Sequence, residues 1–231
     1  MTYPRIDIHE GSIRFADGHR TRVLSYRGLP ESTPQVVVLE HFLTDAECDE
    51  LIELAENKLE PAEVVSSRTG QGFVSPARVA EAVEFAGARY DLTRKIEARI
   101  EAMTHWPSTH FQHFQMIRYG VGGQYRPHHD CYNPDMPAFR EILQTNGQRL
   151  ATFLMYLNDC PRSGATAFPR LDGLFVCPQK GNALFFSYPG SGGKPDISCL
   201  HAAGPVFEGH KWIATTWLCE RENPSSTPIK F

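Results

Sequence analysis

The second half of the chain is a succession of short segments rich in aromatic and β-branched residues, with glycine- and proline-rich turns between them. The segments are residues 111–119, 150–157, 183–188 and 212–218. Segments of this length and composition predict β-strands, and several in succession are typical of a sandwich or barrel. The pattern therefore predicts a β-sandwich or jelly roll as the core of the fold.

The first half of the chain predicts helices that pack on this core. Thr44–Glu47 reads Thr-Asp-Ala-Glu, a capping box that opens a helix, and residues 91–103 repeat apolar side chains at helical spacing. Residues 35–40 predict a strand, residues 1–34 irregular extensions with short strands, and residues 64–87 a loop with a short helix. We expect a mainly β fold whose N-terminal helices cover one outer face.

We predict a single domain, because barrels and sandwiches commonly reach about 200–250 residues as one unit and this chain has 231. Residues 1–107 would hold the N-terminal strands and supporting helices. Residues 108–220 would form the β core that carries the chemistry. Residues 221–231 are polar and proline-rich and predict a frayed tail.

Charge and cysteine usage narrow the class of protein. The chain has 23 Lys and Arg against 27 Asp and Glu, a net charge of −4, which argues against nucleic-acid binding. No apolar stretch approaches the length of a membrane span, and the N-terminus lacks the apolar core of a signal peptide. The six cysteines are scattered without a CxxC pair, so we expect reduced thiols and a cytoplasmic protein. The oligomeric state is not predicted.

The segment Tyr125–Asp130 reads Tyr-Arg-Pro-His-His-Asp. In an extended chain the residues at i and i+2 lie on the same face, so His128 and Asp130 would project together. His201 can supply a third ligand from a distant segment. Two histidines and one carboxylate form the facial triad of non-haem Fe(II), which leaves coordination positions open for a cosubstrate and O₂. The sequence therefore predicts a catalytic metal site.

Lys211 follows His201 by ten residues. If the two lie on neighbouring antiparallel strands, the ammonium would come near the metal. A buried ammonium needs an anionic partner, which a chelating dicarboxylate could supply through its far end.

Simpler interpretations exist for several of these residues. An isolated His-x-Asp triplet occurs by chance, and only its combination with His201 and Lys211 is specific. His129 should point away from the metal and have a structural or solvated role. The histidines near the start of the β core, at positions 105, 110 and 113, are expected to form a surface cluster.

The chain resembles the 2-oxoglutarate- and Fe(II)-dependent dioxygenases of the prolyl 4-hydroxylase type. The matching motifs are Arg118–Asp130, Gln148–Asp159, Ser163–Pro169, Pro178–Phe186, Leu200–Val206, Gly209–Ile213 and Glu40–Ile52. The resemblance spans about residues 36–220. It implies a double-stranded β-helix, which agrees with the strand pattern.

The resemblance also implies roles for nine residues. His128, Asp130 and His201 would hold Fe(II), and Lys211 would pair with the distal carboxylate of 2-oxoglutarate. Tyr119 and Thr152 match positions that line the 2-oxoglutarate pocket, while Tyr125, Arg149 and Trp217 match positions beside the iron on the substrate side. The implied cosubstrates are 2-oxoglutarate and O₂, with ascorbate as reductant. An intact Asp130 favours hydroxylation over halogenation.

Some positions depart from the family pattern. The usual Gly-Gly-Glu-Thr is Ser-Gly-Ala-Thr at 163–166, the usual Arg-Thr-Ser is Arg-Thr-Gly at 68–70, and residues 76–90 do not match. These departures bear on the substrate. Residues 131–146 are polar and are predicted to be irregular and, with residues 64–87, to form a lid.

The expected activity is hydroxylation of an unactivated C–H bond of a prolyl residue in a peptide or protein, with release of succinate and CO₂. Hydroxylation of a free amino acid or another small metabolite is an alternative, since the sequence does not tell whether the groove is open at both ends. A non-catalytic metal-binding β-barrel is a second alternative. A hydrolytic zinc enzyme would need a general base near the triplet, and none is evident.

Overall fold

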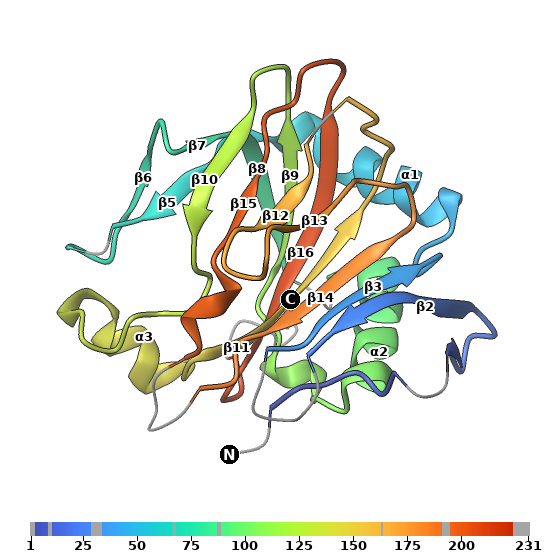
Figure 1. The fold of residues 1–231 in the computed structure, drawn as a ribbon, viewed down its shortest axis with the longest axis horizontal. Helices are drawn as coiled ribbons and strands as arrows, with labels where there is room; N and C mark the ends of the chain where they lie inside the picture. Colours follow the sequence, from blue (N-terminus) through green and yellow to red (C-terminus); the bar gives the residue numbers. More distant parts are fainter. Residues whose placement is uncertain are drawn as a thin grey trace.

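The computed structural model describes residues 3–8, 11–28, 34–66, 68–86, 89–162, 164–190 and 195–223. Within these ranges the chain forms two facing β-sheets with helices behind the larger one (Figure 1). The mainly β architecture with supporting helices confirms the expected fold class. Most of the tail predicted to be frayed, residues 224–231, lies outside the described residues.

The larger sheet has nine strands over the described residues, and all its neighbouring strands are antiparallel. Their order is β1 (Ser12–Arg14), β2 (Arg20–Arg27), β3 (Val36–Glu40), β14 (Ala183–Ser187), β11 (Arg149–Tyr156), β16 (Lys211–Cys219), β9 (Phe114–Tyr119), β8 (Glu81–Phe85) and β4 (Glu60–Pro61). The four strands predicted in the second half of the chain therefore lie together at its centre.

The smaller sheet has five strands over the described residues and faces the first. Their order is β13 (Leu174–Val176), β12 (Thr166–Phe168), β15 (His201–Ala203), β10 (Gln124–His128) and β7 (Arg78–Val79). A separate hairpin pairs β5 (Glu63–Val65) with β6 (Gly72–Val74). Strands β7 and β8 follow each other in the chain but join opposite sheets, so this segment connects the two layers along one edge.

Strand β11 shows how the sequence builds two cores from one strand. Phe153 and Met155 pack with the helices on the outer face of the larger sheet. Leu154 and Tyr156 pack into the space between the sheets. This alternation is the period-2 pattern of an extended chain, and it directs Thr152 to the same side as Leu154, toward the interior of the sandwich.

The helices are α1 (Asp45–Ala55), α2 (Asp91–Thr104) and α3 (Arg140–Thr145), with short 3₁₀ turns at Glu56–Lys58, Ser108–His110, Pro137–Phe139 and Ile197–Cys199. The predicted capping box opens α1: Thr44 accepts from the Glu47 amide, and Glu47 accepts from the Thr44 amide. Apolar side chains of α1 and α2 lie in one core cluster with strands β3, β11 and β14, so both helices cover the outer face of the larger sheet.

Two local predictions were wrong. Residues 64–87 were expected to form a loop with a short helix, but β5–β8 lie there, each two to five residues long. Such short strands carry little local signal and are set by pairing with distant strands. Residues 131–146 were expected to be irregular, but they contain α3. The strand expected at residues 35–40 is β3, and the short strands expected within residues 1–34 are β1 and β2, which extend the larger sheet.

A buried ion pair fixes the two long helices to each other. Arg99 is 2% exposed and donates to both carboxylate oxygens of Glu47, at 2.9 and 2.8 Å. Burial alone would raise the pKa of Glu47, but hydrogen bonds from Arg99 and Lys95 lower it to about 2. The pair therefore joins α1 to α2 and keeps its charge across the physiological pH range.

Replacing Arg99 with methionine is expected to lower the free energy of unfolding by about 3 kcal/mol, because it leaves Glu47 buried with only Lys95 as a cationic partner. The matched change Lys95→Met removes a half-exposed cation and should cost less than about 1 kcal/mol. Urea denaturation of both variants measures the difference, and equal losses would contradict this account.

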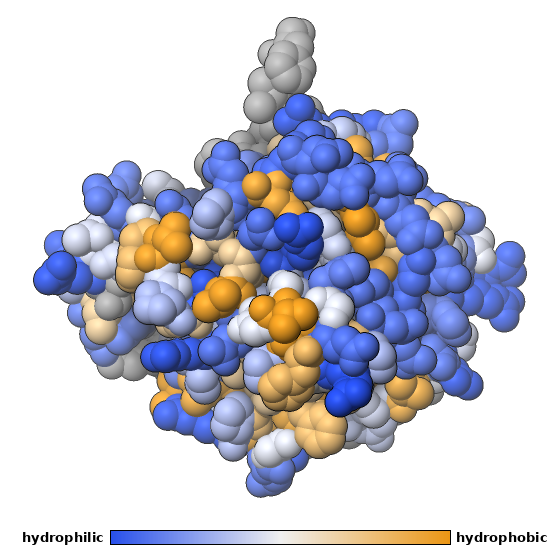
Figure 2. Space-filling view, turned by 90° about the horizontal axis from the view of Figure 1, so that it is seen from above, coloured by the Kyte–Doolittle hydropathy of each residue, from blue (hydrophilic) through white to orange (hydrophobic). Residues whose placement is uncertain are grey.

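Figure 2 shows the end of the molecule that lies at the top of Figure 1. Its surface is mostly hydrophilic, with small separate apolar patches. Among the residues that the structure describes, no helix combines the length and apolar character needed to cross a bilayer. All six cysteines are free thiols.

Candidate active site and metal centre

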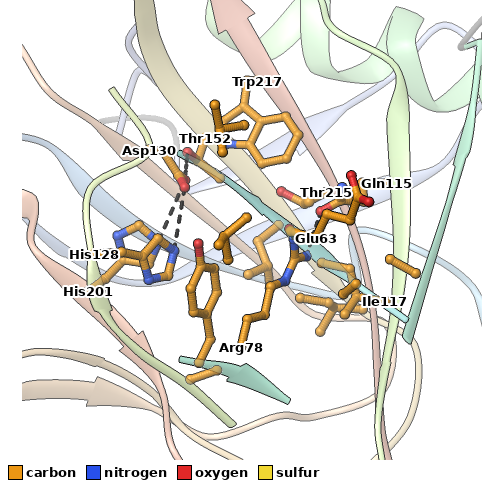
Figure 3. Close-up of a pocket in the computed structure, with 18 of the residues that line it drawn as sticks. Glu63, Arg78, Gln115, Ile117, His128, Asp130, Thr152, His201, Thr215 and Trp217 are labelled. Carbon is orange, nitrogen blue, oxygen red and sulfur yellow. Dashed lines mark hydrogen bonds and ion pairs between the residues drawn. The ribbon is translucent and has the colours of Figure 1, made fainter. Parts of the chain in front are cut away.

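Three side chains that could hold a metal ion meet at the point where β10 and β15 pair. His128 is the last residue of β10 and lies opposite His201, the first residue of β15. Asp130 follows two residues after His128, beyond the end of the strand. Its carboxylate oxygen Oδ1 lies 3.6 Å from His128 Nε2, and its other oxygen, Oδ2, lies 3.5 Å from His201 Nε2 (Figure 3). One ligand atom from each residue falls within 4.8 Å of the others, a spacing that suits one bound cation.

Both imidazoles are held with Nε2 directed at the cluster. His128 Nδ1 lies 2.8 Å from the carbonyl oxygen of Arg126, and His201 Nδ1 lies 3.1 Å from that of Cys199. A carbonyl oxygen only accepts, so each Nδ1 carries a proton, and in the neutral ring the lone pair then lies on Nε2. Burial lowers the pKa of His201 to about 4, which keeps its ring neutral at pH 7. Outer hydrogen bonds of this kind are typical of histidine ligands to metals.

The carboxylate of Asp130 is oriented from outside the cluster. Thr152, on β11, donates to Oδ2 at 2.6 Å, and Arg149 donates to the backbone carbonyl oxygen of Asp130 at 3.2 Å. Burial alone would raise the pKa of this carboxyl, but His201, His128 and Arg149 hold it well below its usual range. Asp130 therefore presents an anionic oxygen to the cluster.

The cluster fits Fe(II) by its donor set and by the space beside it. Two neutral imidazoles and one carboxylate are the ligands of the facial triad. All three side chains line one cavity of about 650 Å³. A ligand set that borders a cavity leaves coordination positions accessible to small molecules, as catalytic metal sites require.

Lys211 brings a buried cation to the same cavity. It is the first residue of β16, is 1% exposed, and donates to the carbonyl oxygen of Gly164 at 2.6 Å. Its ammonium lies over the rings of Tyr119 and Tyr156, at 5.4 and 5.6 Å from their centroids. No carboxylate pairs with it among the described residues, and burial lowers its pKa to about 8. The cavity thus contains a buried ammonium suited to an anionic ligand.

Three further predicted residues form a wall beside the metal ligands. The ring of Tyr125 stacks on that of His128, with centroids 3.6 Å apart. The guanidinium of Arg149 lies 3.8 Å from the centroid of Trp217 and donates to Gln112 at 2.8 Å. The indole Nε1 of Trp217 is buried and has no hydrogen-bond partner among the described residues, so it can donate to a bound molecule. Burial raises the pKa of Tyr125 to about 12, so its hydroxyl stays protonated.

All nine residues singled out from the sequence line this one cavity. One expectation about their arrangement was wrong. His201 and Lys211 were considered for neighbouring antiparallel strands, but β15 belongs to the smaller sheet and β16 to the larger. The two side chains reach the cavity from facing layers, which places it inside the sandwich. His129 was expected to turn away from the metal. Its Nε2 lies 3.0 Å from the carbonyl oxygen of Ile197, and the residue also borders the cavity.

The sequence did not single out several residues that complete the site. Tyr188 shares a 2.6 Å hydrogen bond with Thr152, and Gln112 anchors Arg149. Arg78 and Gln115 also line the cavity and are joined by a 2.7 Å hydrogen bond (Figure 3). Gln112, Gln115 and Tyr188 lie within predicted strands, and their role becomes visible only once the strand register is known. Arg78 lies in residues 64–87, which were expected to be a loop with a short helix, and carries no such signal.

Comparisons with known proteins agree with this geometry. The model of the 2OG-Fe(II) oxygenase superfamily matches residues 114–219. The probable prolyl 4-hydroxylase 6 of Arabidopsis thaliana is 33% identical over 204 residues, covering 80% of this chain and 69% of the relative. The prolyl 4-hydroxylase subunit alpha-1 of Rattus norvegicus is 36% identical over 189 residues, covering 81% of this chain and 35% of the relative. This chain thus spans about a third of the animal subunits that it matches.

Among solved structures, the viral collagen prolyl hydroxylase of Paramecium Bursaria Chlorella virus-1, in complex with 2OG, has a TM-score of 0.60 and 27% identity. The match covers 79% of this chain and 94% of the viral one. A prolyl hydroxylase of Trichoplax adhaerens, in complex with a peptide fragment of hypoxia inducible factor, has a TM-score of 0.52 at 14% identity, which is a likeness of fold.

Proposed function

The chain belongs to the 2OG-Fe(II) oxygenase superfamily, with prolyl 4-hydroxylases as its relatives, and we propose that it hydroxylates a prolyl residue of a peptide or protein. The observation that carries the proposal is the joint placement of two kinds of group in one cavity. A cluster of two histidines and one aspartate borders it, and a buried ammonium without a carboxylate partner among the described residues lies on the facing sheet.

In this proposal His128, Asp130 and His201 hold Fe(II). Bound there with 2-oxoglutarate, the metal would activate O₂, the oxidant, of which one atom enters succinate as 2-oxoglutarate loses CO₂ and the other enters the new hydroxyl group. The chain keeps both histidines in the tautomer that binds metal through Nε2, by means of the carbonyl oxygens of Arg126 and Cys199. Thr152 restrains Asp130. These hydrogen bonds orient the ligands, which lowers the conformational cost of binding the metal.

Lys211 pairs with the distal carboxylate of 2-oxoglutarate. Its position on the sheet facing β10 and β15 sets the direction in which a chelating dicarboxylate would span the cavity. Tyr119, which is 2% exposed, and Thr152 line the walls between the two ends. The buried rings around Lys211 exclude water and strengthen its attraction for an anion.

Tyr125, Arg149 and Trp217 contact the substrate and orient the C–H bond that reacts. Tyr125 keeps its proton and can donate to a peptide carbonyl, as can the indole of Trp217. Arg149 is held rigid between the rings of Trp217 and Tyr132 and the amide of Gln112. Three fixed donors beside the metal ligands suit the carbonyl groups of a peptide better than the few polar atoms of a small metabolite.

The shape of the cavity also supports a peptide substrate. Besides the metal ligands, the cavity is lined by residues of β4 and of the β5–β6 hairpin, namely residues 60–65 and Gly72. Val65, Phe73 and Val74 of this hairpin are about half exposed. A cavity that runs out along an exposed hairpin can admit an extended chain.

The proposal is tested by succinate release from 2-oxoglutarate, with Fe(II) and ascorbate, over a panel of proline-containing peptides, free proline and other amino acids. Proline-containing peptides are expected to stimulate release above the substrate-free rate. Stimulation only by free amino acids would replace the proposal by hydroxylation of a small metabolite. Absence of release with every compound would reject the oxygenase activity and favour a metal-binding barrel without catalysis.

A further inference from the structure

Arg78 is a second buried cation in the cavity, and nothing in the proposed chemistry uses it. It is the first residue of β7, in the segment 76–90 that departs from the family pattern, and is 8% exposed. Strand β7 pairs with β10 in the smaller sheet, while β8 joins the larger one. The side chain of Arg78 therefore enters the sandwich at the edge that this segment closes (Figure 3).

The hydrogen-bond partners of Arg78 are all neutral. One terminal nitrogen donates to the backbone carbonyl oxygen of Glu63 at 2.8 Å, and the other to the side-chain oxygen of Gln115 at 2.7 Å. Its Nε is buried and has no partner among the described residues. Glu84 reaches it only indirectly, by accepting from the Gln115 amide. A guanidinium nine-tenths buried, with one donor unused and no direct counter-ion in the described chain, favours an anionic ligand.

The surroundings of Arg78 place this anion beside the reacting centre. The guanidinium lies 5.1 Å from the ring centroid of Tyr125, and Tyr125 stacks on the metal ligand His128. Lys211 contacts Gly164 and Tyr156, which Arg78 does not, while Tyr119 is a neighbour of both cations. Arg149 also lines the cavity, but it already donates to Gln112 and to the carbonyl oxygen of Asp130. Lys211 and Arg78 are two further cationic positions, and the single free carboxylate of a chelated 2-oxoglutarate occupies one.

We propose that Arg78 binds a carboxylate of the primary substrate, so that the enzyme selects an acidic substrate. The inference rests on the proposed function and names its substrate class. The carboxylate has two chemical sources: an acidic side chain next to the target proline, or the free C-terminal carboxylate of a peptide ending near it. Either source supplies a planar carboxylate within reach of the unused Nε of Arg78, with the ring of Tyr125 next to both Arg78 and His128.

The test compares matched peptides that differ in one carboxylate. One pair carries Glu or Gln beside the proline, and the other ends in a free acid or an amide. Binding is measured by calorimetry with Mn(II) in place of Fe(II), and hydroxylation by succinate release. The wild type is expected to prefer the acidic member of one pair by about 10- to 100-fold in Kd and in kcat/KM. The pair that shows the preference identifies the source.

Variants assign the preference to Arg78. Arg78→Gln should abolish it through a higher Kd and KM for the acidic peptide, leaving the neutral peptide and the KM for 2-oxoglutarate unchanged. Arg78→Lys should restore part of it. Arg118→Gln is the matched control, because this arginine lies on β9, outside the cavity and paired with Glu81. The preference should survive in that variant.

Several results would overturn the inference. These are equal Kd values for both members of each pair in the wild type, a preference that persists in Arg78→Gln, or a rise in the KM for 2-oxoglutarate in that variant. The comparison of peptides on the wild type needs no variant, so it can still overturn the inference if Arg78→Gln does not fold. If acidic peptides bind selectively but no peptide releases succinate, the proposed function fails while Arg78 remains the carboxylate site.

Discussion

Replacing His128 with alanine is expected to abolish Fe(II) binding and succinate release together. The change removes one of three ligand atoms that lie within 4.8 Å of one another and leaves two. Loss of a hydrogen-bond partner behind a metal ligand already costs about 10- to 100-fold in metal affinity, so loss of the ligand itself should exceed about 100-fold. Metal content after dialysis, together with calorimetric titration of Fe(II) under anaerobic conditions, measures the effect.

The neighbouring residue provides the matched control. His129 hydrogen-bonds to the carbonyl oxygen of Ile197 and contributes no atom to the cluster. His129→Ala should therefore keep its Fe(II) affinity within a few-fold of the wild type. If His128→Ala retained metal and turnover while His129→Ala lost them, the ligand assignment would be wrong by one residue and the strand register with it.

The second large effect is expected for Lys211→Met, a change that nearly keeps the side-chain volume but removes the charge. Breaking a buried charge pair by removing one partner costs about 2–5 kcal/mol, so the affinity for 2-oxoglutarate should fall at least about 30-fold. The fold should not suffer. Burial disfavours the ammonium form of Lys211, so the melting temperature at pH 7 without 2-oxoglutarate should be equal or higher.

The pH dependence of 2-oxoglutarate binding separates charge pairing from simple packing. Burial lowers the pKa of Lys211 to about 8, and a carboxylate stabilises only the protonated form. The affinity should be full below pH 8 and decline above it by up to about tenfold per pH unit. Calorimetric titrations with Mn(II) from pH 6.5 to 9.5 measure this decline. The same decline in Lys211→Met would show that another group is responsible.

The parts of the fold predicted best are those with a long local pattern. The capping box at Thr44 and the apolar period of residues 91–103 each specify a helix without help from distant contacts. The central strands carry enough β-branched and aromatic residues to be recognised singly. Their alternation also directs Thr152 inward, because one strand face serves the outer core and the other the interior.

The parts predicted worst depend on distant pairing. Strand β7 has two residues and exists because Arg78 and Val79 pair with Tyr125 and Gln124. No period can be detected over two residues, so the segment was expected to be a loop. The same limit hid Arg78 from the candidate site, since its partners come from β5 and β9. The metal ligands escaped this limit because two of the three lie within one triplet.

The most direct test of the proposed activity is mass spectrometry of a proline-containing peptide after incubation with the enzyme, Fe(II), 2-oxoglutarate and O₂. The account predicts that the peptide gains the mass of one oxygen atom, that fragmentation places this atom on a prolyl residue, and that succinate forms in equal amount. His128→Ala should give neither product. Succinate formation without oxygen on the peptide, or oxygen placed on another residue type, would contradict it.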